Sequence, residues 1–368
     1  MEEELKYLVA LTMIPSIGPQ TARKLIIYTG SAEAVFREKR QALQKIPGIG
    51  QTLAQRTSSS NLINRAEKEL LFCKKNNINI LDYFSDSYPA RLKNCTDAPL
   101  LLLYRGEYCF SSTKVISMVG TRRASAYGTD ICNQLIEDIA EFYPECVIVS
   151  GLAYGIDYQS HLAAVKNNLK TIAVMGHGLH TIYPGQHKNL AFKILKSGCI
   201  CTDFFSDMNP ERNNFIKRNR IIAGLADATL VIESGLKGGA LITADIAGSY
   251  NRDVFTFPGR VGDEKSLGCN SLIKHNRAGL IEGLKDLEYF MGWERGNQNP
   301  APRQKILFTE LSEEEEMVIE ILKDEDKISL DSLGLKLNWP ISKLSSILLN
   351  LEFEGIIRTY PGNYYKLV

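Results

Sequence analysis

Three short apolar runs, each of which stops at a glycine or one residue short of it, restrict the fold of this chain more than any other feature. They span Val115 to Val119, Val147 to Val149 and Thr171 to Met175. Such runs are typical of parallel strands that end at a ligand site. Helical apolar spacing follows them at 125–142, 156–168 and 187–195, and further strands are expected at 200–204, 228–233 and 253–257. The alternation between residues 114 and 293 therefore predicts an α/β fold with a doubly wound, mostly parallel sheet.

The turns that follow these runs predict a phosphate site. Glycine lets the backbone approach a ligand closely, and amides at strand ends and helix starts point at negative charge. Arg122 would supply a fixed cation beside them. The residues expected to meet phosphate are Gly120, Thr121 and Arg122 after the first run and Gly151 and Gly155 after the second.

A second group of cations lies farther along the same expected sheet. Arg212, Lys217, Arg218 and Arg220 fall within nine residues around Phe215, and they lead into a helix expected over 219–225 that begins with Asn219. Cations that meet phosphates and a ring that stacks on a base suit a single nucleic-acid strand. A solvated loop with Arg–carboxylate pairs would have the same composition. The position just before a strand of the same sheet favours binding, because both groups can converge on one edge.

The composition limits the partners and the compartment. Net charge is +1, so a site for a polyanion must be built from a local cluster of cations. Eight cysteines without a CxxC pair indicate reduced thiols. A zinc site can be drawn from Cys199, Cys201, His177 and His180, but strand and loop roles suit these residues better. No segment has the length and apolarity of a signal peptide or a membrane span, so we expect a cytoplasmic protein without a metal or a membrane contact.

Residues 1–80 have the pattern of short helices with a weak internal repeat. The segment from Ile14 to Ala22 is answered by the segment from Ile46 to Ala54, and both resemble a helix-hairpin-helix. In that motif a tight turn exposes amides at the next helix start, where a DNA phosphate can bind without base readout. The same turn could equally serve packing or protein contact, since few basic residues flank either hairpin. Residues 81–113 are expected to connect this helix-hairpin-helix-like module to the sheet.

The end of the chain predicts a separate small domain. Residues 294–305 are polar and contain Gly, Asn and Pro, which indicates a linker. In 306–368, Ser312 and Glu315 form a capping box, further helices are expected at 330–337 and 341–354, and a Tyr-Pro-Gly-Asn turn follows at 360–363. This order indicates a winged helix. Acidic residues at 313–316 and in the third helix favour a structural or protein-contact role over DNA binding.

Several motifs together carry a resemblance to a known family. They are Gly120-Thr121-Arg122 with Tyr127-Gly128, Ser150-Gly151-Leu152-Ala153 with Gly155-Ile156-Asp157 and His161, Tyr183-Pro184, the run from Arg218 to Leu225, and Phe257-Pro258-Gly259 with the run from Ser266 to Asn270. Through these residues the sequence resembles the bacterial DNA-processing protein A family, DprA or Smf, over nearly its whole length. The resemblance implies a helical N-terminal module, an extended Rossmann-like domain and a C-terminal winged helix.

The resemblance also implies a function. The family binds single-stranded DNA during natural transformation, protects it, passes it to the RecA recombinase and forms a homodimer. Its DNA pocket would use Arg122, Lys188, Arg218 and Arg220 here. Two departures stand out: Thr202-Asp203 replaces a Ser-Glu pair, and Lys237-Gly238-Gly239-Ala240 replaces a Ser-Gly-Ser loop, which leaves the contacts expected from Gly238 and Gly239 open.

The competing interpretation is a Rossmann-like enzyme that binds or hydrolyses a nucleotide. Such hydrolases resemble each other in a PGGxGT-type loop followed by a glutamate, whereas this chain has Pro258-Gly259-Arg260-Val261. Glu233 ends a strand without a second carboxylate nearby in sequence. Asp157 and His161 stand four residues apart on one helix, where they are better explained by hydrogen bonds to each other or to the backbone. We therefore expect neither catalysis nor a cofactor.

Overall fold

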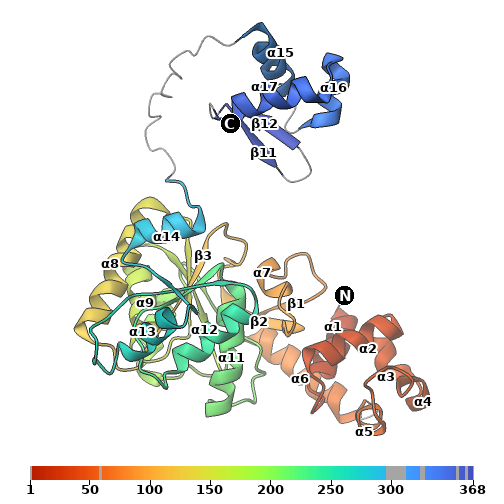
Figure 1. Ribbon diagram of the computed structural model, residues 1–368. Coiled ribbons are helices and arrows are strands. Elements are labelled where there is room, and N and C mark those ends of the chain that lie inside the picture. The colour runs from red at the N-terminus through yellow and green to blue at the C-terminus, as the bar shows by residue number, and fades with distance from the viewer. Residues whose placement is uncertain are drawn as a thin grey trace. The chain divides into compact units, whose positions relative to one another are not determined.

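The computed structural model describes residues 2–57, 60–295, 312–323, 328–353, 356–360 and 364–367. The chain forms two compact units, 1–295 and 296–368 (Figure 1). Most of the predicted linker, 296–305, and the predicted turn residues 361–363 lie outside the described residues, as does Glu354.

A nine-stranded sheet is the centre of the first unit. Its middle strands are almost wholly buried, because they are covered on both faces. Strands β1–β2 and β2–β6 pair antiparallel, and all other neighbours pair parallel. The order across the sheet is β1 (Asn79–Asp82), β2 (Leu101–Gly106), β6 (Cys199–Thr202), β5 (Lys170–Val174), β4 (Val147–Ser150), β3 (Val115–Val119), β7 (Ala228–Val231), β8 (Asp253–Thr256) and β9 (Gly279–Leu280).

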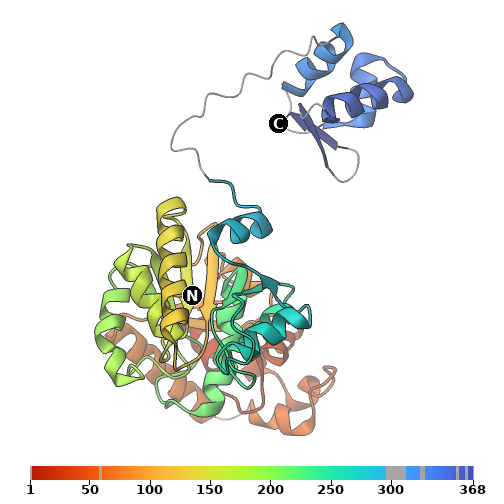
Figure 2. The same ribbon diagram turned by 60° about the vertical axis from the view of Figure 1, so that its left-hand side comes forward.

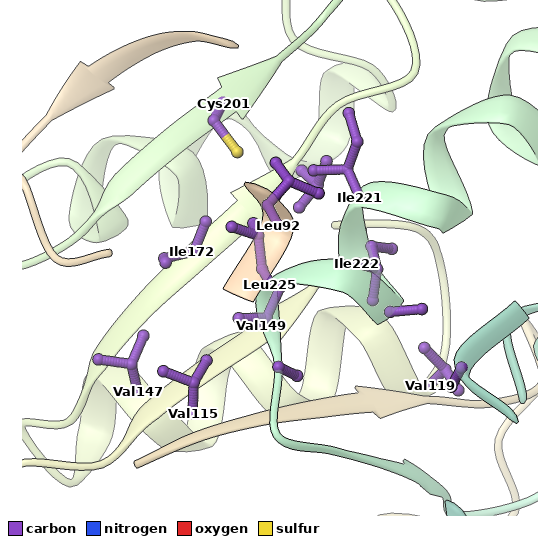
Figure 3. Close-up of a cluster of buried hydrophobic side chains, with 14 of the residues drawn as sticks. Leu92, Val115, Val119, Val147, Val149, Ile172, Cys201, Ile221, Ile222 and Leu225 are labelled. Atoms are coloured by element: carbon purple, nitrogen blue, oxygen red, sulfur yellow. The ribbon is translucent and has the colours of Figure 1, made fainter. Parts of the chain in front are cut away.

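Helices cover both faces of this sheet, as the turned view in Figure 2 shows. Because side chains alternate along a strand, Val115, Val147 and Val149 face one layer, where they meet Ile222 and Leu225 of α11 (Figure 3). The neighbouring residues on the same strands face α8 and α9. The helices of these layers are α7 (Ala90–Lys93), α8 (Ala126–Phe142), α9 (Ile156–Lys166), α10 (Lys188–Ile194) preceded by the short η1 (Gly185–His187), α11 (Arg212–Leu225), α12 (Gly239–Ser249), α13 (Leu267–Lys274) and α14 (Leu284–Met291). The predicted doubly wound, mostly parallel α/β fold is confirmed.

Helix α11 differs from its prediction. It begins at Arg212 rather than at Asn219, so the basic cluster lies on a helix and not in a loop. Arg218 is buried with Ile221, Ile222 and Leu225. The helical spacing of apolar residues is hard to recognise in this part of the sequence, because Arg218, a charged residue, occupies a position that faces the core.

The N-terminal helices pack on the sheet through β2. Leu101 and Leu103 join a core with Leu11, Leu25 and Leu43. The helices are α1 (Glu2–Thr12), α2 (Pro19–Thr29), α3 (Ala32–Arg37), α4 (Arg40–Leu43), α5 (Gln51–Arg56) and α6 (Ser60–Lys75).

The two predicted hairpins have the same backbone. Gly18 and Gly50, which precede α2 and α5, have φ/ψ of −83°/171° and −82°/172°. The turns before them require positive φ, 71° at Ser16 and 87° at Gly48. The tandem helix-hairpin-helix is therefore confirmed as a fold.

The second unit is a winged helix, as predicted. Its strands pair in the order β10–β12–β11, and Val318, Leu333 and Leu348 lie in its core. The backbone amide of Ser312 donates to Glu315 Oε2 (2.9 Å), which confirms the capping box. The elements are α15 (Glu313–Lys323), β10 (Ile328–Ser329), α16 (Leu330–Leu337), α17 (Ile341–Phe353), β11 (Ile357–Tyr360) and β12 (Tyr364–Leu367).

Candidate nucleic-acid interface

The strand order reverses beside β3, and a cavity lies at this point. The chain runs from β3 through β4, β5 and β6 on one side and then returns through α11 to β7 on the other. Ligands of open α/β sheets bind where the order reverses, outside the carboxyl ends of the strands. The cavity there has a volume of about 450 Å³, and we call it the switch-point cavity. Its lining includes Gly120, Thr121 and Arg122, Asp157, Arg212, Phe215, Arg218 and Asn219, and Lys237, Gly238 and Gly239.

The loop after β3 is fixed from two sides. The amide of Thr121 donates to the carbonyl of Glu233 (2.7 Å), and the carbonyl of Thr121 accepts from the amide of Ile156 (3.2 Å). Gly120 is required because a Cβ there would lie 2.5 Å from Ile156 Cγ1. Arg122 comes next and is exposed on the rim of the cavity. The loop therefore presents a cation without needing to rearrange.

The side chain of Glu233 connects this loop to the start of α8. Its side chain is 2% exposed. Oε2 accepts from the amide of Ser125 (2.8 Å) and Oε1 accepts from the Ser125 hydroxyl (2.5 Å). Since Ser125 also caps α8, the glutamate ties the helix start to the end of β7. Both carboxylate oxygens are engaged, which argues against a water-activating role.

The loop after β4 closes on the protein itself. The amides of Gly151 and Ala153 donate to the carboxylate of Asp157, and the carbonyl of Gly151 accepts from Arg218 Nη1 (2.7 Å). A Cβ on Gly151 would overlap the Arg218 guanidinium. Gly155 has φ 75°, and a Cβ there would overlap the carbonyl of Thr121. Gly151 and Gly155 thus let protein segments approach one another, and the amide of Gly151, expected to meet a phosphate, points to Asp157.

Arg218 and Asp157 are two buried, opposite charges in the wall of the cavity, and each influences the pKa of the other. Arg218 is 4% exposed, and Nη1 also donates to the carbonyl of Val174. Burial lowers the pKa of Arg218, an effect that Asp157 opposes. Burial raises the pKa of Asp157, and Arg218 and the two amide donors oppose that rise. Arg218, predicted as a phosphate contact, therefore holds the ends of β4 and β5 against α11.

Aromatic rings stand beside the exposed cation. The guanidinium carbon of Arg122 lies 5.9 Å from the ring centroid of Phe215. The rings of Phe215 and Tyr183 lie 5.7 Å apart at 30°. Phe215 fits there because a Cβ on Gly176 would lie 2.8 Å from its Cδ1. Tyr183 was not among the predicted site residues, although its Tyr-Pro motif was visible in the sequence. The three side chains form a surface on which bases could stack.

The start of α12 forms another wall. Gly238 precedes the helix and has no side-chain cap, and a Cβ on it would overlap the Ser234 hydroxyl. Gly239 has open space around the position of a Cβ. Lys237 is exposed beside them. The positive end of the helix dipole therefore faces the cavity with a lysine next to it.

Three predicted cations lie elsewhere. Lys217 and Arg220 line a second cavity of about 550 Å³, where Arg220 pairs with Asp203. Lys188, at the start of α10, lines a third cavity of about 250 Å³. Helix α11 therefore divides the predicted cluster, with Arg212, Phe215, Arg218 and Asn219 on one cavity and Lys217 and Arg220 on the other.

His161, a further candidate group, is buried and has a hydrogen-bond partner on only one ring nitrogen. His161 Nδ1 lies 2.7 Å from the hydroxyl of Thr171 rather than beside Asp157. Burial lowers the pKa of His161 to about 3. In the described part of the chain, no three His, Cys, Asp or Glu side chains are grouped as metal ligands. No helix among the described residues is long and apolar enough to cross a membrane.

A cavity at the switch point of a doubly wound sheet, with cations, rings and a helix start around it, is typical of proteins that bind nucleotides or polynucleotides. Comparison with known families narrows this class. The family model of DNA recombination-mediator protein A matches residues 79–292, that of the DprA winged helix domain matches 300–363, and that of a SAM-like helix-hairpin-helix tandem matches 8–56. The chain belongs to the DNA recombination-mediator protein A family, also called DprA or Smf.

Individual relatives and solved structures support this family membership. Protein Smf of Escherichia coli is 32% identical over 307 residues, which are 82% of this chain and 80% of the relative. The X-ray structure of DprA from Streptococcus pneumoniae matches with a TM-score of 0.66 and 30% identity, over 77% of this chain and 97% of that one. A structure that concerns the single-stranded DNA binding mode of DprA from Helicobacter pylori matches with a TM-score of 0.53 and 24% identity, over 60% and 97%. The last likeness shows the shared fold.

Proposed function

We propose that this protein binds single-stranded DNA in the switch-point cavity, protects it, and delivers it to a RecA recombinase in natural transformation and DNA recombination. The observation that carries the proposal is the position of Arg122 over the ring of Phe215, which in turn packs against the ring of Tyr183, at the cavity. A cation can hold a phosphate while a ring stacks on the next base. A duplex keeps its bases paired and cannot offer them to such a surface.

Binding rather than catalysis fits the residues of the cavity. Glu233 has both oxygens engaged, and the Asp157 carboxylate is buried beside the backbone amides of Gly151 and Ala153. The sequence contains no GxxxxGK[ST] loop, so ATP-driven remodelling by this chain has no support. Its contribution to recombination would therefore be a handover of the strand to a partner that hydrolyses ATP. Transforming DNA reaches such a partner in the cytoplasm, which is where we place the protein.

The dimer that we propose has a candidate surface. Strand β9 forms one end of the nine-stranded sheet, and Leu280 on it is 42% exposed. On the following helix Tyr289 is 82% and Phe290 49% exposed. An open strand edge beside exposed rings is suited to self-association. Two linked cavities would hold one long strand more tightly than either alone. Light scattering at micromolar concentration should report a dimer, whereas a monomer with and without DNA would contradict it.

The binding proposal is tested by titrating fluorescent oligonucleotides at two salt concentrations. Single strands should bind more tightly than a blunt duplex of the same length, with slight sequence preference. The affinity should fall as salt rises, because each neutralised phosphate releases counterions. Equal affinity for the duplex would reject the proposal.

The handover is tested with RecA from the same organism. Single strands are first coated with a single-strand-binding protein, and ATP hydrolysis by RecA is followed with and without this chain. Loading predicts faster onset of hydrolysis. If the onset does not change while the chain still binds bare strands, the protein is a DNA-binding protein without loader activity.

A further inference from the structure

A second cavity lies on the other side of α11. It has a volume of about 550 Å³, and we call it the hairpin cavity. The first hairpin of the N-terminal module forms one wall, and the segment after β6 forms another. The lining includes the hairpin residues from Ile14 to Pro19, Arg65, the residues Asp203, Phe204, Phe205, Asp207 and Met208, and Lys217 and Arg220 of α11.

The shape of this cavity is maintained by contacts that do not involve a ligand. Arg56 Nη1 donates to the carbonyl of Pro15 (2.7 Å) and to the hydroxyl of Ser16 (2.9 Å). In the same way Lys24 Nζ donates to the carbonyl of Pro47 in the second hairpin (2.8 Å). Each hairpin is thus held by a cation from the other half of the repeat. The first hairpin therefore presents a fixed surface to the cavity.

The walls of the hairpin cavity combine apolar surface with one available cation. Ile17 and Phe205 are buried in the wall, and Met208 is 43% exposed at its edge. The carboxylates are neutralised, since Asp207 pairs with Arg65 (2.8 Å) and Asp203 pairs with Arg220. Lys217 is exposed and forms no ion pair within the described parts of the chain. Apolar walls with a single uncompensated cation suit a base and its phosphate.

The two cavities are neighbours along one helix. Phe215 and Arg218 line the switch-point cavity, whereas Lys217, between them in sequence, lines the hairpin cavity. Ile216 is 42% exposed on the path from one to the other. The two cavities are separated by little more than the thickness of α11, and a helix with its side chains is roughly 10 Å across. A strand that leaves Phe215 needs few nucleotides to pass this distance.

We propose that the hairpin cavity binds the next part of the same single strand, with Lys217 at a phosphate and the wall near Met208 and the first hairpin against a base. This inference rests on the proposed binding of a strand in the switch-point cavity. It assigns the N-terminal module a direct part in strand binding, through the apolar wall of its first hairpin rather than through Arg56 and Lys24, which hold the two hairpins.

The test compares strands of two lengths. An oligothymidylate of about six nucleotides can fill the switch-point cavity, and one of about 25 can reach both. The variants are Lys217→Glu and Met208→Glu, which place negative charge at the rim of the hairpin cavity. The control is Lys166→Glu, which makes the same charge change as Lys217→Glu and a larger one than Met208→Glu, at the exposed end of α9, where the chain turns back toward the amino end of β5.

Both hairpin-cavity variants should weaken binding of the long strand about tenfold relative to the control, a loss of the size expected for one stacked base or one phosphate. They should leave the affinity for the short strand within about twofold. Lys217→Glu should also lower the slope of log affinity against log salt for the long strand by about one. Arg122→Ala should weaken both lengths.

Two results separate the failure of this inference from the failure of the proposed function. If Lys217→Glu and Met208→Glu bind the long strand as the control does, while wild type still binds both lengths, the hairpin cavity is no DNA site and an apolar peptide becomes the better occupant. If wild type binds neither length, the proposed function fails and the inference fails with it.

Discussion

The loops after β3 and β4 lie at the same edge of the sheet and both contain glycines, yet one is open to a ligand and the other is closed. The first holds its backbone through Thr121 and leaves Arg122 exposed at the cavity. The second turns its amides toward Asp157 and its carbonyl toward Arg218. In the open loop, glycine brings the chain close to where a ligand would lie. In the closed loop it makes room for an arginine of the protein itself.

This difference distinguishes an arginine that can contact a ligand from an arginine that stabilises the fold. An exposed arginine near rings can exchange water for a phosphate at little cost, because its charge remains solvated until the ligand arrives. A buried arginine that already donates to two carbonyls would have to give up those bonds first. We therefore expect substitutions in the open loop to change binding and substitutions in the closed loop to change stability.

The largest effect is expected from Arg218→Met. The change leaves the buried Asp157 without its nearby opposite charge and the carbonyls of Gly151 and Val174 without a donor. Leaving two buried carbonyls without their charged donor costs about 3 kcal/mol of unfolding free energy. Urea unfolding measures it, with Arg122→Met as the control that should change stability by no more than about 0.5 kcal/mol. Equal losses in the two variants would remove the distinction between the loops.

The glycines offer a second comparison. Gly151→Ala should cost about 2 kcal/mol of unfolding free energy, since the added Cβ overlaps the Arg218 guanidinium and forces it to move. Gly239→Ala should be close to neutral, because nothing lies within 4 Å of its Cβ position. Thermal unfolding of the two variants tests this. A neutral Gly151→Ala would mean that the closed loop is more adaptable than its contacts indicate.

The free energy of unfolding should also fall at acid pH because of His161, which lies on α9 one turn beyond Asp157. Its folded pKa of about 3 is below the unfolded value near 6.5, so the unfolded state takes up the proton first. The stability that the fold gains from keeping this imidazole neutral is fully present above the unfolded pKa, and it is lost as pH falls below that pKa. Between pH 7.5 and pH 5 the loss should be about 2 kcal/mol. Urea unfolding across this range should show a shallower pH dependence for His161→Asn, and parallel curves would contradict it.

On the open side, Arg122→Ala should weaken single-strand binding about tenfold for every sequence, because a phosphate contact carries no base information. The slope of log affinity against log salt should fall by about one. Lys188→Ala tests whether the strand also reaches the third cavity. A similar loss of affinity would mean that the bound strand extends to Lys188, and unchanged affinity would mean that it contacts only the cavities beside α11. Circular dichroism should show both variants folded. Unchanged binding by Arg122→Ala would move the site away from the open loop.

The sequence predicted the sheet and the flanking modules because their signals are local. Apolar runs with glycine ends identify strands, and the repeated hairpin residues identify the N-terminal tandem. It also predicted which loops meet at the edge. It could not separate Arg122 from Arg218, since both are arginines in segments expected at the same edge of the sheet, and only packing shows that Arg122 is exposed whereas Arg218 is 4% exposed. Nor could it show that α11 sends Lys217 and Arg218 to different cavities, because that depends on where the helix begins.

The smallest effect, a change in the affinity for single-stranded DNA, is expected from removing the second unit. Residues 312–368 contain eleven Asp or Glu and six Lys or Arg, so this unit repels a phosphate backbone. On α17, the helix that would enter a DNA groove, Lys343 already pairs with Glu314 (2.8 Å), while Leu349 and Phe353 are exposed. Such a helix is suited to contact with a protein. A chain ending at Arg295 should therefore bind a single strand within about threefold of the full chain at the same salt concentration, a change below 1 kcal/mol. A tenfold loss would show that the winged helix holds DNA in spite of its charge, and the strand would then have a third region of contact besides the two sides of α11.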